Sequence, residues 1–222
     1  MGDWITLPTS HGPVQAWHAI PNGSPRGAVI VVQEIFGANA HIRAVAERLA
    51  DAGFVALAPS MFDPVQPDAD FAYDDAGMTR GRTLAGELGF DAAVEILRAA
   101  QHFLTGDGHH CAVIGFCWGG SVALLGNTRL AMPGVAYYGA RSVPFLGEPL
   151  QAPMLFHFGA DDPLVPAEDI QHHRAAYPQA DVFVYEGAGH AFNRDIDPHH
   201  FHPEAARLAW RRTLDFLQAN LA

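Results

Sequence analysis

The chain has 222 residues and a mass of 23.9 kDa, of which 49% are hydrophobic and 17% charged. This composition excludes a disordered chain, because disorder needs low hydrophobicity and high charge. Thirteen Lys and Arg against 24 Asp and Glu give a net charge of −11. Such an acidic surface repels nucleic-acid phosphates and anionic lipids, so we expect neither nucleic acid nor a membrane as a partner.

The N-terminus and the cysteines bear on the compartment. Met1–Trp4 shows no cationic region followed by an apolar stretch, as a secretory signal would, and no apolar run approaches the roughly 20 residues of a membrane span. Cys111 and Cys117 are too few for a disulfide framework and lack the spacing of a zinc site. We therefore expect one cytoplasmic domain over residues 1–222, as a monomer or a small homo-oligomer.

The first part of the chain alternates between strand and helix patterns. Val14–Ile20 alternates enough for a strand, and Ala28–Val32 is an apolar run typical of a strand buried on both faces. The spacing of apolar residues predicts a helix over His41–Ala52, which Gly53 ends. Phe54–Ala58 is the next predicted strand.

Residues 60–82 carry no regular pattern and contain Pro64, Pro67 and five Asp between Asp63 and Asp75. Long segments of this kind in compact domains are usually functional loops, and the pattern does not distinguish a mobile lid from a fixed wall. A helix is predicted to follow from about Leu84 to Leu104.

The remaining chain continues the alternation. The predicted strands are Ala112–Ile114, Val135–Tyr138, Met154–Phe158 and Val182–Tyr185, and the predicted helices are Ser121–Asn127, Ala167–Tyr177 and Pro203–Asn220. Buried strands separated by helices predict an α/β fold with a doubly wound, mostly parallel sheet and helices on both faces. In such sheets the chemistry gathers at the carboxyl ends of the strands.

The strongest chemical signal is G-F-C-W-G-G at residues 115–120, between a predicted strand and a predicted helix. G-x-C-x-G is the cysteine form of the nucleophile elbow, in which Gly115 and Gly119 make room for a tight turn. The following helix N-terminus stabilises a thiolate, and the backbone N–H of Trp118 faces a developing oxyanion. The motif predicts Cys117 as a nucleophile rather than a structural cysteine.

A thiol nucleophile needs a base, and the base needs an orienting acid. G-A-D-D-P-L-V-P at residues 159–166 follows one late strand, and G-A-G-H ending at His190 follows the last. This order predicts His190 as the base. Asp161 and Asp162 compete for the acid, and the spacing to the Val-Pro pair favours Asp162, with Asp161 as a turn residue.

Q-E-I-F-G at residues 33–37 ends the first buried strand. A carboxylate at Glu34 would face the same cleft as Cys117, and the loop after this strand supplies a second oxyanion donor in α/β-hydrolases. The alternative is a glutamate that faces solvent at a strand end.

These motifs resemble the dienelactone hydrolase (carboxymethylenebutenolidase) family, small single-domain α/β-hydrolases with a Cys-His-Asp triad. The resemblance runs from Val29 to Leu217. It is tightest in Gln33–Asn39, Gly115–Gly120, Val135–Gly139, Asp162–Pro166 and Tyr185–Phe192.

The resemblance implies a thiol that is gated by substrate. Glu34 would hydrogen-bond the resting Cys117 thiol and take its proton when substrate binds, and the backbone N–H groups of Ile35 and Trp118 would form the oxyanion hole. The implied reaction opens a dienelactone to maleylacetate through a cysteinyl-acyl intermediate, with no cofactor. The implied triad is Cys117, His190 and Asp162.

The family substrate carries a carboxylate, so cationic side chains should line the pocket. The resemblance places one at Arg194 and a second at Arg80 or Arg82, since residues 63–89 do not align well enough to choose between them. The alternative for these arginines is an exposed position at a helix start. The identity of the substrate depends on this segment.

Two other function classes stay open. A broader carboxylesterase or thioesterase would use the same triad. A redox sensor would use Cys117 without turnover, but Cys111 begins a predicted strand and is better explained as a core residue. The three histidines of His199–His202 point in different directions along the chain, so a solvated loop is a better explanation than a metal site.

Overall fold

The computed structural model describes residues 2–106 and 108–221, and they form two compact units. The first unit contains the described residues as far as Val113 together with Leu221, and the second contains Ile114–Asn220. Strand β5 (Cys111–Phe116) begins in the first unit and ends in the second. No helix in the described part of the chain is long and apolar enough to cross a membrane.

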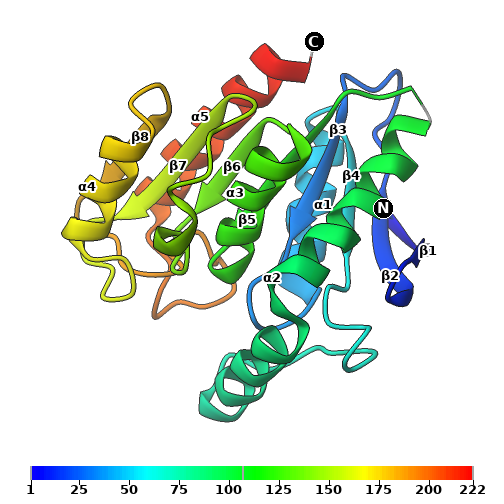
Figure 1. The fold of residues 1–222 in the computed structure, drawn as a ribbon, viewed down its shortest axis with the longest axis horizontal. Helices are drawn as coiled ribbons and strands as arrows, with labels where there is room; N and C mark the ends of the chain where they lie inside the picture. The colour runs from blue at the N-terminus through cyan, green and yellow to red at the C-terminus, as the bar shows by residue number, and fades with distance from the viewer. Residues whose placement is uncertain (1, 107, 222) are drawn as a thin grey trace. The chain divides into compact units, whose positions relative to one another are not determined.

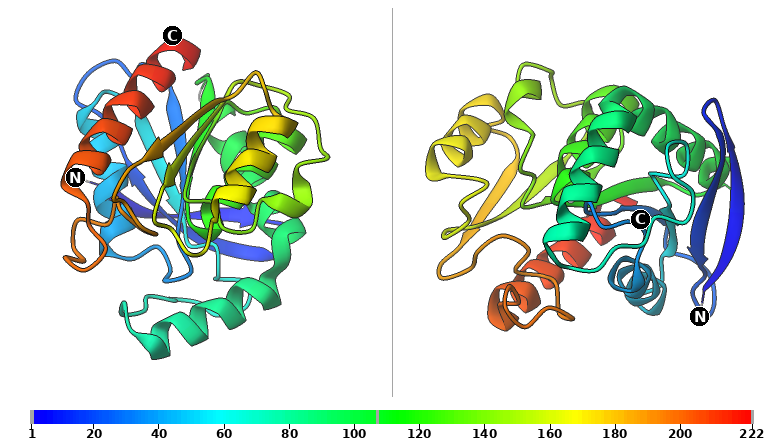
Figure 2. Two further views of the ribbon diagram at one scale, coloured as in Figure 1. Left: turned by 90° about the vertical axis from the view of Figure 1, so that its left-hand side faces the viewer. Right: turned by 90° about the horizontal axis from the view of Figure 1, so that it is seen from below.

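The first unit is built on strands in the order β1-β2-β4-β3, with the start of β5 beyond β3. β3 and β4 are parallel, while β1 and β2 form an antiparallel hairpin that is visible in Figure 2. Helices α1 and α2 pack against these strands. The bounds are β1 Gly2–Thr9, β2 Gly12–Ala19, β3 Ala28–Val32, α1 Ala40–Asp51, β4 Val55–Pro59 and α2 Asp75–Gly106.

Two features of this unit differ from the sequence prediction. Strand β1 was not predicted, because it is a half-exposed edge strand whose apolar alternation is weak and ends at Pro8. Helix α2 begins at Asp75 rather than near Leu84, and Figure 2 shows its first half. Glycines before Leu84 hide the helical pattern, and Gly89, with φ 73°, kinks the chain inside the helix that was predicted as continuous.

The second unit continues from the end of β5 through β6 (Gly134–Tyr137), β7 (Met154–Gly159) and β8 (Asp181–Tyr185). β6, β7 and β8 are parallel. Helices α3 (Trp118–Leu130), α4 (Ala167–Ala176) and α5 (Pro203–Leu221) cover them, with a short 3₁₀ turn at Val143–Phe145. Figure 1 shows these elements in green to red.

Strand β7 shows how the sequence divides the two faces. Phe156 and Phe158 join Leu124 of α3 and Ile170 of α4 in an apolar core, because alternate side chains of a strand share a face. Between them His157 points to the other face, where it contacts α5. Figure 2 shows α4 and α5 on opposite sides of the strands of this unit.

The strands form an eight-stranded, mostly parallel sheet with flanking helices, which confirms the predicted α/β class. The predicted strands and helices of the second unit are all present, with ends that differ by a few residues.

Candidate active site

The turn between β5 and α3 is strained in the way that the glycines predict. Cys117 has φ 54° and ψ −118°, a conformation that residues with a Cβ rarely adopt. A Cβ at Gly115 would collide with the carbonyl oxygen of Gly119, and a Cβ at Gly120 would lie 2.9 Å from the carbonyl oxygen of Tyr137. The sharp turn leaves Cys117 half-buried, directly before the first residue of α3.

The backbone of the elbow is tied to the neighbouring strand. The amide of Cys117 donates to the carbonyl oxygen of Tyr137, at the end of β6, over 3.0 Å. The Cys117 carbonyl accepts from the amide of Gly120 at 2.9 Å. Because the Cys117 amide is occupied, a donor for a developing oxyanion has to come from another residue.

Asp162 and His190 meet at the carboxyl ends of β7 and β8. Nδ1 of His190 lies 2.8 Å from Oδ2 of Asp162, and Oδ1 of Asp162 accepts from the amide of Leu164 at 2.8 Å. The Asp162 side chain has no exposed surface, whereas neighbouring Asp161 is exposed. Of the two candidate aspartates, Asp162 is therefore the one that contacts His190.

The electrostatics link His190 to Cys117 as well. Burial alone would lower the pKa of His190, but the charge of the Cys117 sulfur and the hydrogen bond with Asp162 raise it to about 10. Since Nδ1 is engaged by Asp162, the buried Nε2 is the nitrogen left to face the sulfur. This arrangement favours the protonated form of the His190 ring.

Aromatic side chains that the sequence reasoning gave no role surround His190. The ring of Tyr138 lies edge-on to the His190 ring at 5.0 Å and to Phe192 at 5.4 Å. Tyr138 and Ala191 adopt left-handed backbone conformations, with φ of 41° and 62°. The signal was the Tyr-Tyr-Gly sequence directly after a buried strand, where strained residues often mark functional sites.

The Q-E-I-F-G segment of the first unit lies at the end of β3. Glu34 is 1% exposed, so it is not the solvent-facing strand-end residue of the alternative interpretation. Gln33 is also buried, and its Oε1 accepts from the amide of Met61 at 3.1 Å. The side chain of Gln33 thereby connects this segment to the start of the 60–74 loop.

The 60–74 loop is attached to the same segment. Gly37 and Asp70 form a β-bridge, and the amide of Phe71 donates to the carbonyl of Phe36 over 3.0 Å. Nδ2 of Asn39 donates to the Tyr73 hydroxyl at 2.9 Å. These contacts favour a fixed wall over a mobile lid.

The three candidate arginines have different surroundings. Arg80 and Arg82 are both exposed on α2, and Arg80 donates twice to Oε1 of Gln66, at 2.9 and 2.6 Å. Arg194 is 5% exposed, and its Nη1 lies 3.0 Å from Oδ2 of Asp197. Only Arg194 is therefore built into the interior of its unit.

The histidine-rich run after Arg194 has structural contacts. Nδ1 of His200 lies 2.7 Å from Oδ2 of Asp197, and Nδ1 of His202 accepts from the amide of Ala205 in the first turn of α5. Burial would raise the pKa of Asp197, but its hydrogen bonds, that from His200 foremost, hold it below its ordinary value. Among the residues that the structure describes, no three His, Cys, Asp or Glu side chains are grouped to hold a metal ion.

Cys111 is a buried residue of β5, and burial raises the pKa of its thiol to about 12. A thiol in such surroundings stays protonated and unreactive at neutral pH.

Comparison with known proteins identifies the family. Residues 14–221 match the model of the family described as "Dienelactone hydrolase family". A "Putative carboxymethylenebutenolidase" of Escherichia coli (strain K12) is 32% identical over 239 residues, covering 97% of this chain and 86% of that protein. A "Probable 2-oxo-3-(5-oxofuran-2-ylidene)propanoate lactonase" of Bradyrhizobium is 33% identical over 242 residues, covering 99% and 94%.

A solved structure extends the agreement to the fold. The crystal structure of a "Putative Dienelactone Hydrolase" from Klebsiella pneumoniae superposes with a TM-score of 0.86 at 29% identity and covers 97% of both chains. On the family match and these likenesses, the chain belongs to the dienelactone hydrolase family.

Proposed function

We propose that this family member opens a lactone that carries a carboxylate, a dienelactone to maleylacetate, with Cys117 as nucleophile, His190 as base and acid, and Asp162 as the orienting acid. The observation that carries the proposal is the 2.8 Å contact between Oδ2 of Asp162 and Nδ1 of His190, together with the electrostatic interaction of the His190 ring with Cys117. A carboxylate, an imidazole and a thiol in this order are what nucleophilic catalysis by cysteine requires.

In the first half-reaction the Cys117 thiolate attacks the lactone carbonyl carbon and a C–S bond forms. The ring C–O bond then breaks, and the imidazolium of His190 gives its proton to the leaving enolate oxygen. The pKa of His190, raised to about 10, keeps the ring protonated at neutral pH while the thiolate is present. The product of this step is a cysteinyl thioester.

In the second half-reaction the neutral His190 ring takes a proton from water, and the resulting hydroxide adds to the thioester carbonyl. The C–S bond breaks, the acid product leaves, and the Cys117 thiolate takes back the proton that Glu34 accepted when substrate bound. The amides of Trp118 and Ile35 would donate to the oxyanion in both halves, because the Cys117 amide is bound to Tyr137. The released enol becomes the ketone of maleylacetate.

Glu34 is proposed as the acceptor of the thiol proton when substrate binds. The burial of Glu34 at the end of β3 supports a role inside the site rather than at the surface. The relative from Bradyrhizobium, whose printed name is that of a lactonase for a propanoate-bearing oxofuran, supports a lactone with a carboxylate.

Arg194 is proposed to face that carboxylate, with Arg80 or Arg82 as a second cation. Asp197 already neutralises part of the Arg194 charge, so substrate would share the guanidinium with Asp197. The arginine can serve both, because a guanidinium has five donors.

Arg194→Met should raise KM for carboxylate-bearing lactones at least about tenfold and leave KM for neutral aryl esters unaffected. Arg98→Met, on the exposed surface of α2, is the matched control.

The test of the function is steady-state turnover of cis- and trans-dienelactone, followed by ultraviolet absorbance. The wild type should hydrolyse one or both isomers, and Cys117→Ala should hydrolyse neither. Cys111→Ala should behave as the wild type. If dienelactone is inert but an aryl ester is cleaved with the same dependence on Cys117, a broader carboxylesterase replaces the dienelactone assignment. If no ester is cleaved, the redox-sensor hypothesis gains support, and reversible oxidation of Cys117 by peroxide tests it.

A further inference from the structure

A chain of hydrogen bonds among interior side chains joins β6, β7, β8 and α5 of the second unit. The Tyr137 hydroxyl lies 2.6 Å from Oγ1 of Thr213, which lies 3.1 Å from Nε2 of His157. Nδ1 of His157 lies 2.8 Å from the Tyr185 hydroxyl, to which Nη1 of Arg212 donates at 3.1 Å. These five residues are called the core relay below.

The chemistry of the donors orients the core relay. A guanidinium can only donate, so the Tyr185 oxygen accepts from Arg212 and its O–H donates to Nδ1 of His157. Nδ1 of His157 therefore carries no proton. A neutral imidazole then has its proton on Nε2 and donates it to Oγ1 of Thr213. With Nδ1 protonated instead, the Tyr185 oxygen would accept twice and its own proton would need a third partner.

His157 is suited to stay neutral. Its side chain is fully buried, and burial, followed by the nearby charge of Arg212, lowers its pKa to about 3. Hydroxyl groups both donate and accept, so Tyr185 and Thr213 satisfy the ring without adding charge to the interior. The relay keeps one direction of hydrogen bonding throughout the neutral pH range.

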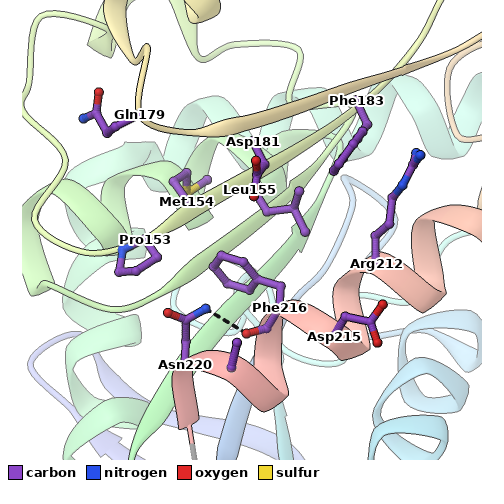
Figure 3. Close-up of a pocket in the computed structure, with 11 residues that line it drawn as sticks. Pro153, Met154, Leu155, Gln179, Asp181, Phe183, Arg212, Asp215, Phe216 and Asn220 are labelled. Atoms are coloured by element: carbon purple, nitrogen blue, oxygen red, sulfur yellow. Dashed lines mark hydrogen bonds between the residues drawn. The ribbon is translucent and has the colours of Figure 1, made fainter.

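The outer end of the core relay reaches the surface. Arg212 lines a cavity of about 350 Å³ between β7, β8 and α5, and Figure 3 shows it beside Phe183. The central carbon of its guanidinium lies 3.8 Å from the centre of the Phe183 ring. Stacking on this ring holds the guanidinium in place as the first donor.

The backbone of the same residues holds the catalytic groups proposed above. The carbonyl of Tyr137 accepts from the amide of Cys117 at 3.0 Å. The carbonyl of Tyr185 accepts from the amides of Ala160 and Ala188, at 2.9 and 3.3 Å. Ala160 lies two residues before Asp162, and Ala188 lies two residues before His190.

The central member of the relay makes a similar backbone contact. The carbonyl of His157 accepts from the amide of Tyr138 at 2.8 Å, and the Tyr138 ring lies against His190. The side chains of Tyr137, His157 and Tyr185 are thus joined to one another, while their carbonyls hold the nucleophile, acid and base segments.

We propose that the core relay is a positioning device, which keeps the Cys117 elbow and the Asp162 and His190 loops in register through the carbonyls of Tyr137, His157 and Tyr185. The proposal rests on the proposed function for the roles of those three groups. An apolar core would fill the same space without polar groups to satisfy, so five connected polar side chains indicate a requirement for one geometry.

The first test replaces the central hydroxyl. Thr213→Val keeps the shape of the side chain but removes the link between His157 and Tyr137, and kcat should fall about tenfold with little change in KM, because reacting groups shift while the substrate contacts stay. Thr213→Ser restores the hydroxyl and should restore kcat. Thr105→Val, the same change on the exposed surface of α2, controls for the substitution itself.

The second test measures the reactivity of the Cys117 thiol, which does not depend on turnover of a substrate. The rate at which iodoacetamide alkylates Cys117, measured against pH, should shift in Thr213→Val and return in Thr213→Ser. Tyr185→Phe, which removes the donor to Nδ1 of His157, serves if Thr213→Val does not fold, and it should shift the same profile. Nitrogen NMR of the wild type should show His157 protonated on Nε2 only, unchanged between pH 5 and 9.

Several outcomes would overturn the positioning role. The positioning role is wrong if Thr213→Val folds and keeps the kcat and the alkylation profile of the wild type. It is also wrong if Thr213→Ser is as impaired as Thr213→Val. An His157 signal protonated on Nδ1 contradicts the direction of the relay. If the wild type cleaves no ester, the proposed function fails, and the alkylation profiles of the same variants still decide the relay.

Discussion

His190 and His157 lie in the same unit, the first with a side chain 13% exposed and the second fully buried, yet their pKa values move in opposite directions. Burial alone would lower both values. His190 contacts the Asp162 carboxylate and faces the Cys117 sulfur, and its pKa rises to about 10. His157 contacts two hydroxyls, and its pKa falls to about 3.

The difference shows that partners, rather than depth, decide the charge of a buried ring. Charged partners at the strand ends raise the pKa of His190, as its proposed role as a proton donor needs, whereas hydroxyl partners leave the buried His157 ring neutral. The site and the core behind it therefore use the same residue type for different purposes. The predictions below change the partners of one ring at a time.

The largest effect should follow from removing the sulfur. Cys117→Ala should lower kcat by about 10⁵-fold or more, because the proposed nucleophile is lost. It should also bring the pKa of His190 down from about 10, since the charge of the sulfur is the largest cause that raises it. Turnover and an NMR titration of His190 measure the two effects.

Cys111→Ala is the control for this substitution, since Cys111 is a buried residue of β5 outside the site. It should leave both turnover and the His190 titration as in the wild type. A His190 pKa that stays near 10 in Cys117→Ala would show that the Asp162 carboxylate suffices, and would contradict the role given to the sulfur.

Removing the charge of the orienting acid should come next. Asp162→Asn should lower kcat by about 10⁴-fold, because an amide can impose the wrong tautomer on His190 and no longer stabilises its charge. Asp161→Asn makes the same change one residue earlier on an exposed side chain. Equal losses in the two variants, measured as kcat on the same ester, would contradict the choice of Asp162.

The neutral ring should make the protein sensitive to acid. Between pH 6.5 and 3 the unfolded chain binds a proton at His157 that the folded chain does not, so the free energy of unfolding rises with pH. This stability is complete above pH 6.5 and is lost as the pH falls, by up to about 1.4 kcal/mol per pH unit. Urea denaturation at a series of pH values measures it.

His157→Gln removes the titrating ring and should flatten this dependence, even if the variant is less stable at pH 7. His102→Gln, on the exposed surface of α2, should keep the slope of the wild type. A slope that does not change in His157→Gln would mean that the acid sensitivity comes from other groups.

The smallest effect is expected at a third buried histidine. His173 lies edge-on between Phe156 and Phe158, at 5.1 and 5.0 Å, and its Nε2 has no hydrogen-bond partner in the described part of the chain. His173→Phe should change the free energy of unfolding by less than about 1.5 kcal/mol, because it strands few polar partners. His157→Phe, which leaves the Thr213 and Tyr185 hydroxyls unpaired, should cost more in the same urea experiment.

The elements of the second unit could be predicted because each depends on a short, local pattern. The run Met154–Phe158 is apolar except for His157, and the glycines of the elbow all lie within six consecutive residues. Helix α2 was predicted only from about Leu84, because glycines in its first turns resemble a loop when they are judged by propensity. The tertiary structure explains the glycine at position 81, where the helix backbone lies so close to the Ile35 carbonyl that a Cβ would collide with it.

The sequence by itself determined the α/β class, the position of the elbow and the order of Cys117, an aspartate and His190 along the chain. Only the tertiary structure decided that Asp162 and not Asp161 contacts His190, that Arg194 is held by Asp197, and that His157 links Tyr185 to Thr213. The physical reason is the separation along the chain of the residues that interact. Patterns of strands, turns and helices act over a few neighbours, whereas His190 and Asp162 are 28 residues apart and Tyr137 and Thr213 are 76 apart. Such pairs exist only once the strands are assembled.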